Sequence, residues 1–161
     1  MATVHLAPMT QVEYDEMLAR LIPSYAQSHV DAGNWSAGEA LDRARAQTVE
    51  LLPEGANSAN AVLRTARNDE GVVVGRVWIG FRDTDRTAAW IYEIEVDETH
   101  RGGGYGRALL AAAEQEAAQQ GATSIGLNVF GPNQIARDLY TSAGYDVTSI
   151  QMSKSLNGGR G

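Results

Sequence analysis

The feature of this sequence that most constrains its fold is a group of glycines at 102–106. It lies between a segment of alternating apolar residues and an alanine-rich segment. Residues 88–96 read as a strand, residues 101–106 have the sequence Arg-Gly-Gly-Gly-Tyr-Gly, and residues 104–120 read as a helix that Gly121 ends. Glycine lets backbone N–H groups converge, and a helix start adds free donors and a partial positive charge. The stretch therefore predicts a strand, an anion-binding loop and a helix, with a phosphate as the expected anion.

The spacing of these glycines limits the classes of phosphate ligand that the loop could bind. A dinucleotide fingerprint needs a third glycine where Arg107 stands, and a P-loop needs a Gly-Lys pair, whereas the one lysine of the chain is Lys154. Both kinds of nucleotide loop are therefore excluded. A tight strand-to-helix turn that binds nothing stays open as the alternative reading of the same glycines.

The other periodic segments predict one mixed α/β domain over residues 1–156. Two helices come first, each opened by a capping box, and Pro23 should kink or break the first of them. The expected helices cover 10–32, 36–52 and 132–144, and the expected strands cover 61–66, 72–81, 88–96, 125–130 and 145–152. We expect the tail, 157–161, to be disordered.

Composition excludes several classes of function. The 161 residues, 43% hydrophobic and 20% charged, suit one globular domain, and no apolar run is long enough to cross a membrane. No cysteine is present, the three histidines lack metal-ligand spacing, and the net charge of −7 opposes binding to nucleic acid. With no signal peptide recognisable at its start, we expect a cytoplasmic protein without a metal and without a nucleic-acid or membrane partner.

Two motifs give the chain a resemblance to the GNAT N-acetyltransferases. Residues 101–106 fit the family's acetyl-CoA motif, Arg/Gln-x-x-Gly-x-Gly/Ala, position for position. Residues 133–145 look like its second signature, Asn-x-x-Ala-x-x-Leu-Tyr-x-x-x-Gly-Phe/Tyr. The similarity covers 72–152 well, and the two helices at the start resemble those of a small, little-characterised bacterial subgroup.

The resemblance implies a fold and an activity. The fold would be α/β, with a central, mostly antiparallel, splayed sheet of six to seven strands flanked by about four helices. The activity would be direct transfer of acetyl from acetyl-CoA to a primary amine of a small molecule, an amino acid, an aminated antibiotic or a peptide N-terminus, without a metal. Dimers are common in the family, so a homodimer is also to be considered.

The resemblance further assigns residues to acetyl-CoA. The pyrophosphate would lie on the N–H groups of 102–106 and the pantetheine beside 94–96, with the backbone N–H near Val96 polarising the thioester carbonyl. Asn133 would contact pantetheine or cap a helix, and Arg137 would contact phosphate or solvent. The residues expected to bind acetyl-CoA are Ile94, Val96, Arg101, Gly102, Gly103, Gly104, Tyr105, Gly106, Arg107, Asn133 and Arg137.

Proton transfer needs a base and an acid. An alkyl amine must first lose a proton, which costs roughly 4 to 5 kcal/mol at neutral pH. Alternation places Glu93 and Glu95 on one face of the strand, opposite Tyr92, Ile94 and Val96. Glu93 matches an acidic position of the family and is the first choice for the base, with Glu95 second; a solvated strand face is the alternative.

Tyr140 matches the family tyrosine that protonates the departing thiolate, with core packing as the alternative. The acceptor would be selected by Tyr25, His29 and Trp35 of the first helices and by Asn128, although each of these would also suit a structural role.

Two other functions compete with acetyl transfer. A non-catalytic acyl-CoA-binding sensor domain would keep the glycine loop without the chemistry. An acetylating toxin that acts on charged tRNA is disfavoured by the net charge of −7 and the lack of a basic run.

Overall fold

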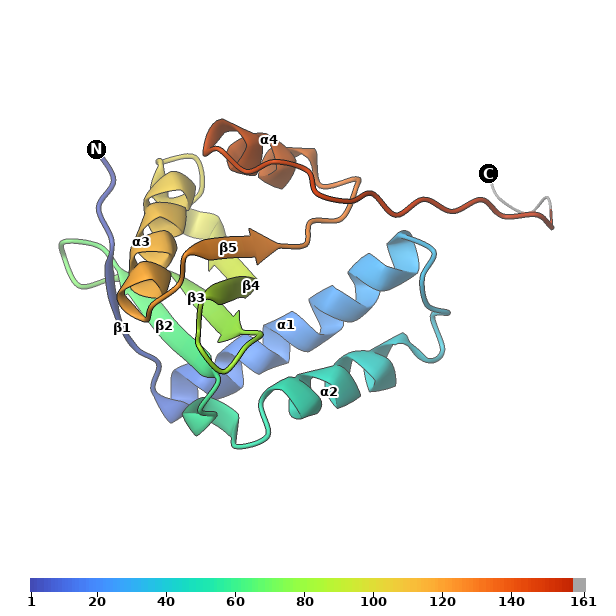
Figure 1. The fold of residues 1–161 in the computed structure, drawn as a ribbon, viewed down its shortest axis with the longest axis horizontal. Coiled ribbons are helices and arrows are strands. Elements are labelled where there is room, and N and C mark those ends of the chain that lie inside the picture. Colours follow the sequence, from blue (N-terminus) through green and yellow to red (C-terminus); the bar gives the residue numbers. More distant parts are fainter. Residues whose placement is uncertain (158–161) are drawn as a thin grey trace.

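Five strands form one sheet in the order β1–β2–β3–β4–β5 in the computed structural model, which describes residues 1–157 (Figure 1). Neighbouring strands are antiparallel except β4 and β5, which are parallel. The strands are β1 His5–Pro8, β2 Ala61–Arg67, β3 Val73–Phe81, β4 Ala88–Val96 and β5 Ser124–Leu127.

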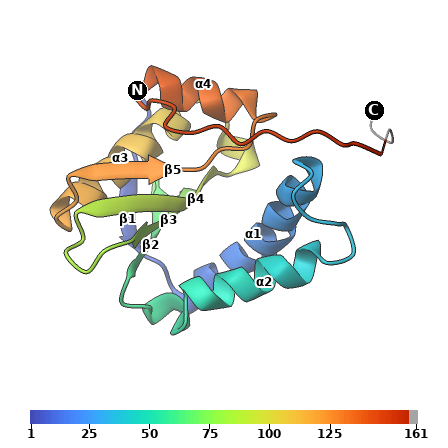
Figure 2. The same cartoon turned by 45° about the vertical axis from the view of Figure 1, so that its right-hand side comes forward.

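Helices cover both faces of this sheet. In Figure 2, α1 and α2 lie together on one face, and α3 lies on the other face with α4 beyond it. The helices are α1 Gln11–Asp31, α2 Ala40–Leu51, α3 Tyr105–Gln119 and α4 Gln134–Ser142, with 3-10 turns η1 Gly55–Asn57 and η2 Glu98–His100.

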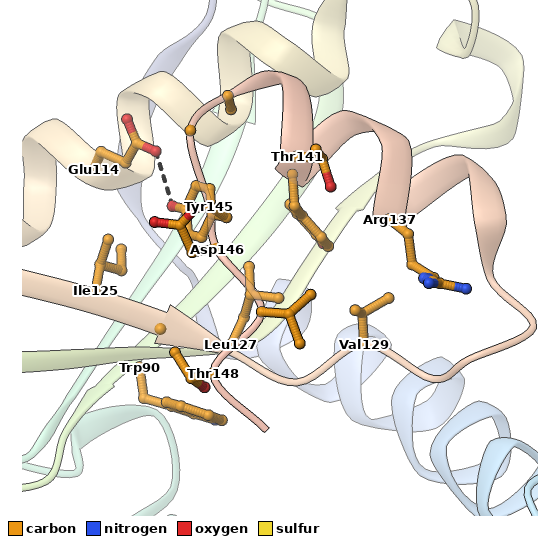
Figure 3. A pocket seen from close by; sticks show the side chains of 15 residues that line it. Trp90, Glu114, Ile125, Leu127, Val129, Arg137, Thr141, Tyr145, Asp146 and Thr148 are labelled. Atoms are coloured by element: carbon orange, nitrogen blue, oxygen red, sulfur yellow. Dashed lines mark hydrogen bonds between the residues drawn. The ribbon is translucent and has the colours of Figure 1, made fainter. Parts of the chain in front are cut away.

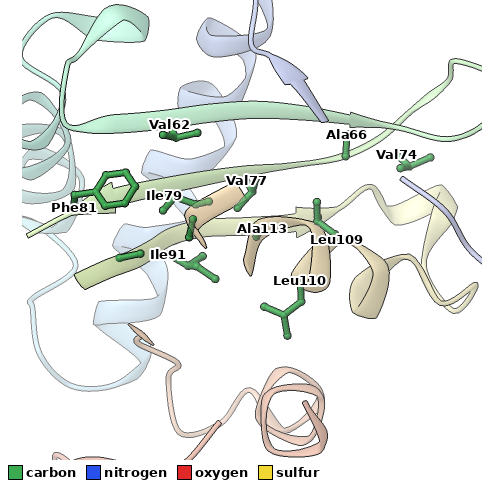
Figure 4. Packing of buried hydrophobic residues seen from close by; sticks show 12 residues of the cluster. Val62, Ala66, Val74, Val77, Ile79, Phe81, Ile91, Leu109, Leu110 and Ala113 are labelled. Atoms are coloured by element: carbon green, nitrogen blue, oxygen red, sulfur yellow. The ribbon is translucent and has the colours of Figure 1, made fainter. Parts of the chain in front are cut away.

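Side-chain alternation along β3 divides the core into two layers. Val77 and Ile79 are fully buried against α3, where they meet Leu109 and Leu110 (Figure 4). Trp78 points to the other face and packs with Met17 of α1 and neighbouring apolar side chains. Both faces of β3 are apolar because both are covered, which explains its nearly continuous apolar sequence.

The start of α1 confirms its predicted capping box. The Thr10 hydroxyl accepts from the Glu13 N–H at 3.1 Å, and the Glu13 carboxylate accepts from the Thr10 N–H at 3.0 Å. The helix then runs through Pro23 without a break, contrary to one of the predicted outcomes. Leu21 and Ala26 are buried on either side of Pro23, and this packing holds the helix together across the missing hydrogen bond.

The second predicted capping box does not form. The Ser36 hydroxyl donates to the Glu39 carboxylate at 2.7 Å instead of accepting from the backbone, and α2 begins only at Ala40. The hairpin of β2 and β3 confirms its prediction, with the Asn68 side chain closing the turn through the N–H groups of Glu70 and Val72.

The predicted strand over 145–152 is absent from the described chain, so the sheet has five strands rather than six to seven. Residues 146–156 are extended but pair with no other strand of the described chain. Asp146, Val147 and Thr148 instead line a cavity together with Ile125 and Leu127 of β5, and no ladder forms across it in the described chain. Of the tail predicted to be disordered, 158–161 lie outside the described residues.

Candidate functional site

The parallel pair β4 and β5 separates soon after it forms. Its register covers four pairs, from Ala88 with Ser124 to Ile91 with Leu127. Beyond Ile91, β4 continues to Val96 with β3 on one side and no strand of the described chain on the other. The second half of β4 therefore presents an open edge, as the predicted splayed sheet requires.

Backbone groups of β4 point into this opening. Asp97 donates its N–H to the Val74 carbonyl at 2.8 Å, and antiparallel pairing turns the groups of the preceding residue to the opposite edge. The Val96 N–H thus faces the opening, where a thioester carbonyl could accept from it. The Val96 carbonyl faces the same way and accepts from Arg101 Nε at 3.0 Å.

A β-bulge at Tyr92 changes which side chains share a face. Trp78 pairs with Glu93 and Ile79 with Ile91, so Tyr92 is an extra residue in β4. Its ring stacks on Trp78 with centroids 4.8 Å apart, on the same face as Glu93. Ile94 and Val96 lie on the opposite face as predicted, but Tyr92 does not, because the bulge interrupts the alternation.

Glu93 is a partly buried carboxyl beside the opening. Burial raises its pKa to about 7, and the nearby charge of Glu95 acts in the same direction. Arg76, Arg20 and the Ile94 N–H oppose that rise without cancelling it. A carboxyl with such a pKa can take up and release a proton near neutral pH, as a general base must.

Glu95 is held in an ion-pair cluster. Arg76, whose side chain is only 7% exposed, donates to Glu95 at 2.6 Å and also to Asp97. Arg101 lies 3.6 Å from the other Glu95 oxygen. Two cations therefore hold Glu95 in place, whereas no salt bridge joins Glu93 to a cation in the described chain.

Tyr140 lies on α4, is partly buried, and packs against the apolar core between the sheet and α3. Burial raises the pKa of its hydroxyl, and the charge of Glu93 raises it further. The structure thus brings Glu93 and Tyr140 within electrostatic range of each other although they are far apart in sequence. A tyrosine with a raised pKa stays protonated and can donate its proton to a leaving group.

The glycine loop has the geometry of an anion site. Gly102 and Gly104 have φ of +81° and +86°, which residues with a Cβ rarely adopt, and Gly104 is the N-cap of α3. No side chain of the described chain caps this helix, so the N–H groups of its first turn stay available to a ligand. The loop therefore has a geometry suited to the phosphate that the glycine spacing predicts, and the pyrophosphate that the resemblance implies stays a prediction.

Three polar residues that were expected to contact acetyl-CoA form hydrogen bonds within the protein. Arg107 donates to the Ser142 hydroxyl at 2.6 Å and joins α3 to α4, while Arg137 donates to the Gly131 carbonyl at 3.1 Å. Asn133 caps α4 by accepting from the Ala136 N–H at 3.3 Å, one of its two predicted roles. All three are exposed near α4, where a ligand can reach them.

The aromatic residues predicted for acceptor selection form one cluster. His29 stacks on Trp35 at 3.9 Å between centroids and meets Tyr25 edge-on at 4.6 Å. Phe130, which follows β5, lies 5.0 Å from His29 and was not foreseen. Burial and the nearby Arg43 lower the pKa of His29, and its Nε2 is buried without a hydrogen-bond partner among residues 1–157.

The remaining predicted residue, Asn128, is exposed in the loop after β5 and is not part of this cluster. Arg76 was missed by sequence reasoning. Its signal was a lone charge within the apolar run 72–81, the pattern of a buried cation that needs carboxylate partners.

A cavity of about 500 Å³ lies between the outer edge of β5, helix α4 and the chain that follows it (Figure 3). Leu127 and Val129 form one wall, Tyr140 and Arg137 the helical wall, and Tyr145 its back. The Tyr145 hydroxyl donates to Glu114 at 2.8 Å and fixes the start of the C-terminal segment to α3.

Two further properties concern metals and membranes. Among residues 1–157, no three His, Cys, Asp or Glu side chains gather in a way that could hold a metal ion. In the same range, no helix has both the length and the apolarity needed to cross a membrane.

Comparison with known proteins identifies relatives along almost the whole chain. The family model described as "Acetyltransferase (GNAT) family" matches residues 25–145. N-acetyltransferase YycN of Bacillus subtilis, itself uncharacterized, is 34% identical over 155 residues, which cover 96% of this chain and 99% of YycN. YdgE of the same organism, also an uncharacterized N-acetyltransferase, is 29% identical, with 94% and 97% covered.

Solved structures agree with these relatives. The crystal structure of YycN from Bacillus subtilis superimposes with a TM-score of 0.91, covering 96% of this chain and 99% of that one at 34% identity. A structure from Pyrococcus furiosus, described as an acetyl transferase by assignment, superimposes with a TM-score of 0.64 at 27% identity. The match covers 97% of this chain and 100% of that one.

Proposed function

Because this chain belongs to the GNAT acetyltransferase family and is an N-acetyltransferase, we propose that it transfers acetyl from acetyl-CoA directly to a primary amine, with Glu93 as base and Tyr140 as acid. The family uses acetyl-CoA as its donor and acts on amines. The assignment of roles rests on one observation: a carboxyl with a pKa of about 7 lies beside the open edge of β4, within electrostatic range of Tyr140.

The proposed chemistry moves three protons and exchanges one bond. Acetyl-CoA supplies the acetyl group as a thioester. The Glu93 carboxylate takes one proton from the ammonium group, and the carbon–nitrogen bond then forms as the carbon–sulfur bond breaks. The Tyr140 hydroxyl gives its proton to the departing sulfur and regains one from the nitrogen of the new amide, and the Val96 N–H supports the negative charge on the carbonyl oxygen.

The residues that would hold acetyl-CoA are those of the loop and the open edge. The N–H groups of 102–106 suit the pyrophosphate because two positive-φ glycines shape this loop and no side chain of the described chain caps the start of α3. Arg107 in the first turn of α3 and Arg137 on α4, both exposed, would add positive charge. The pantetheine would run beside 94–96, whose outward edge has no strand partner in the described chain.

Glu95 takes a positioning role in this proposal. Its pairing with Arg76 and Arg101 fixes its position, and its charge acts on Glu93 from the same strand face. A fixed neighbouring carboxylate makes Glu93 a stronger proton acceptor, because a like charge disfavours the ionised form.

The acceptor class follows from charge and shape. The carboxylate of Glu93 and the net charge of −7 favour an amine that arrives as a cation. The cluster of Tyr25, His29, Trp35 and Phe130 offers apolar surface and aromatic faces for the rest of the acceptor. A small amine, an amino acid, an aminated antibiotic and a peptide N-terminus all meet these requirements.

Thermal unfolding with ligands is the direct test. Acetyl-CoA at about 100 times its Kd should add about 2.7 kcal/mol of stability, or roughly 5 to 10 °C in Tm, while NADH and ATP should add little. Amines of the four classes are then screened by release of CoA. No shift with acetyl-CoA would overturn the proposal, and a shift without turnover on any amine would favour the acyl-CoA-binding sensor domain.

A further inference from the structure

Arg20 of α1 is an arginine that the fold itself does not use. Every other arginine among residues 1–157 forms a hydrogen bond, a salt bridge or a contact with an aromatic ring. Within the same residues, Arg20 forms none of these, and it is exposed. Its guanidinium group is therefore available to a ligand.

A small cavity lies between α1 and the sheet face that α1 covers (Figure 2). It has a volume of about 170 Å³, and Arg20 lines it together with the buried Arg76 and with Asp97. Arg76 pairs with Glu95 of β4, and Glu93 is the next residue of β4 on that face, roughly 6–7 Å away along the strand. Arg20 therefore borders the part of the sheet that carries the proposed base. Burial raises the pKa of Glu93, and the charge of Arg20 acts against this rise, which agrees with this location.

The other charged groups of the cavity leave Arg20 as its available cation. Arg76 and Glu13 already have salt-bridge partners within the protein. Glu16 lies one turn before Arg20 on α1, but it forms no salt bridge among the described residues. A single cation beside carboxylates suits an anion with one negative charge better than a phosphate with two.

We propose that Arg20 binds a carboxylate of the acceptor, and that the acceptor is therefore a free amino acid. The paired N–H groups of an arginine match the two oxygens of a carboxylate. In an amino acid the amine and the carboxylate are attached to the same carbon, so the amine can approach Glu93 while the carboxylate reaches Arg20. This inference rests on the proposed function, because it takes Glu93 as the group that the amine approaches.

Charge complementarity favours an amino acid over the other three acceptor classes. A small amine or an aminated antibiotic carries positive charge only, so Arg20 would repel it. A peptide N-terminus has an amide in place of the nearby carboxylate and offers Arg20 no negative charge. The zwitterion of an amino acid presents its positive charge to Glu93 and its negative charge to Arg20.

Paired acceptors test the role of Arg20. The common L-amino acids are compared with their α-amides, which keep the amine and lose the carboxylate. For each acceptor, kcat/KM of the wild-type protein is divided by kcat/KM of Arg20→Gln. This ratio should be about 10 to 100 for amino acids and below about 3 for amides. The different amine pKa values of acid and amide cancel within each ratio, and an effect of Arg20 on Glu93 changes both ratios alike.

Two more variants serve as controls. Arg20→Lys keeps the positive charge and should keep the preference for amino acids over amides. Arg45→Gln removes an exposed arginine of α2, which pairs with Asp42 at 3.8 Å, and should give ratios near 1 for both kinds of acceptor. Ratios for Arg20→Gln that are equal for acids and amides would overturn the inference and leave the proposed acetyl transfer intact.

Calorimetry separates this inference from the proposed function. Each amino acid is titrated into the protein saturated with CoA, which carries no acetyl group and permits no turnover. Binding to the wild-type protein that is about 10- to 100-fold weaker in Arg20→Gln supports the carboxylate site, even where no amine is acetylated. The inference is overturned by an absence of binding for every amino acid, or by equal affinity of the two proteins.

Discussion

Arg76 holds Glu95 at 2.6 Å from a side chain that is almost completely buried. Arg76 of β3 pairs with Glu95 of β4, and the next pair on the same face of the sheet is Trp78 with Glu93. Two carboxylates thus share one strand face, but only one of them has a buried cation as its partner. This difference supports the proposal that Glu95 has a structural task and that Glu93 transfers the proton.

Replacing this cation should destabilise the fold. In Arg76→Met, Glu95 and Asp97 lose their shared partner and repel each other, and we expect a loss of about 2–4 kcal/mol in the free energy of unfolding. Urea denaturation measures it. Arg45→Met is the control, because Arg45 forms a 3.8 Å surface pair with Asp42 that should contribute less than about 0.5 kcal/mol. Equal losses in the two variants would show that Arg76 is not an organising residue.

Glu93 should make stability depend on pH. Its pKa is about 7 in the fold and near 4.5 in the unfolded chain, so between these values the folded state holds a proton that the unfolded state has lost. The contribution of Glu93 to stability therefore falls as pH rises from about 4.5 to 7, by about 1–3 kcal/mol, and this contribution is constant on either side. Glu93→Gln should remove this decrease when the free energy of unfolding is measured by denaturation at several pH values. An identical slope in both proteins would place the pKa of Glu93 elsewhere.

The ionisation of Glu93 should also make activity depend on pH, but activity should rise with pH where the stability contribution falls. Because the base must be ionised, kcat/KM should rise about tenfold per pH unit below 7 and then level off, apart from the limb that belongs to the amine. An amine acceptor with a lower pKa should shift only the part of the pH profile of kcat/KM that reports deprotonation of the amine. Glu93→Gln should lower kcat by about 10²–10⁴ and abolish the limb near 7. Retention of that limb in the variant would assign it to another residue.

Tyr140→Phe should lower turnover more than affinity. Loss of the proton donor affects the departure of the thiolate, so we expect kcat to fall at least tenfold while the Kd for acetyl-CoA changes little. Tyr145→Phe is the matched control, since it removes a nearby hydroxyl that binds Glu114. Calorimetry gives the Kd and CoA release gives kcat. Unchanged turnover in Tyr140→Phe would remove Tyr140 as the acid.

Gly102→Ala should weaken acetyl-CoA binding, and Gly71→Ala should not. Both glycines have φ of +81° and open space around them, so alanine costs each a similar backbone strain of about 1 kcal/mol. Gly71 lies in the turn between β2 and β3, away from the loop. Tm should fall alike in both variants, but only Gly102→Ala should reduce the further shift with acetyl-CoA. Equal shifts would leave the loop a structural turn.

Much of the fold could be predicted because its signals are local. The capping box at Thr10, the turn that Asn68 closes and the glycines around α3 each act within a few residues, and the structure confirms them. The second capping box failed because side-chain hydrogen bonding at Ser36 and Glu39 competed with the backbone. Local sequence patterns do not resolve such competition.

The errors that concern the site arise from long-range pairing. Alternation alone placed Tyr92 opposite Glu93, and only the register against β3 reveals the extra residue. The strand expected over 145–152 has a suitable sequence, but in the described chain it forms no ladder with the free edge of β5. Arg76 lay unnoticed in an apolar run because its partners belong to β4 and the loop after it.

The bulge at Tyr92 also bears on insertions and deletions. Without Tyr92, Ile91, Glu93, Ile94 and Glu95 would alternate without interruption and keep their present faces, so the extra residue is not required for the strand to fold. A bulge bends and twists its strand, and this one lies where β4 stops pairing with β5. A chain that lacked this single residue should therefore fold with a straighter β4 and a longer ladder to β5. It would retain its core and lose the space in which an acetyl group could be passed.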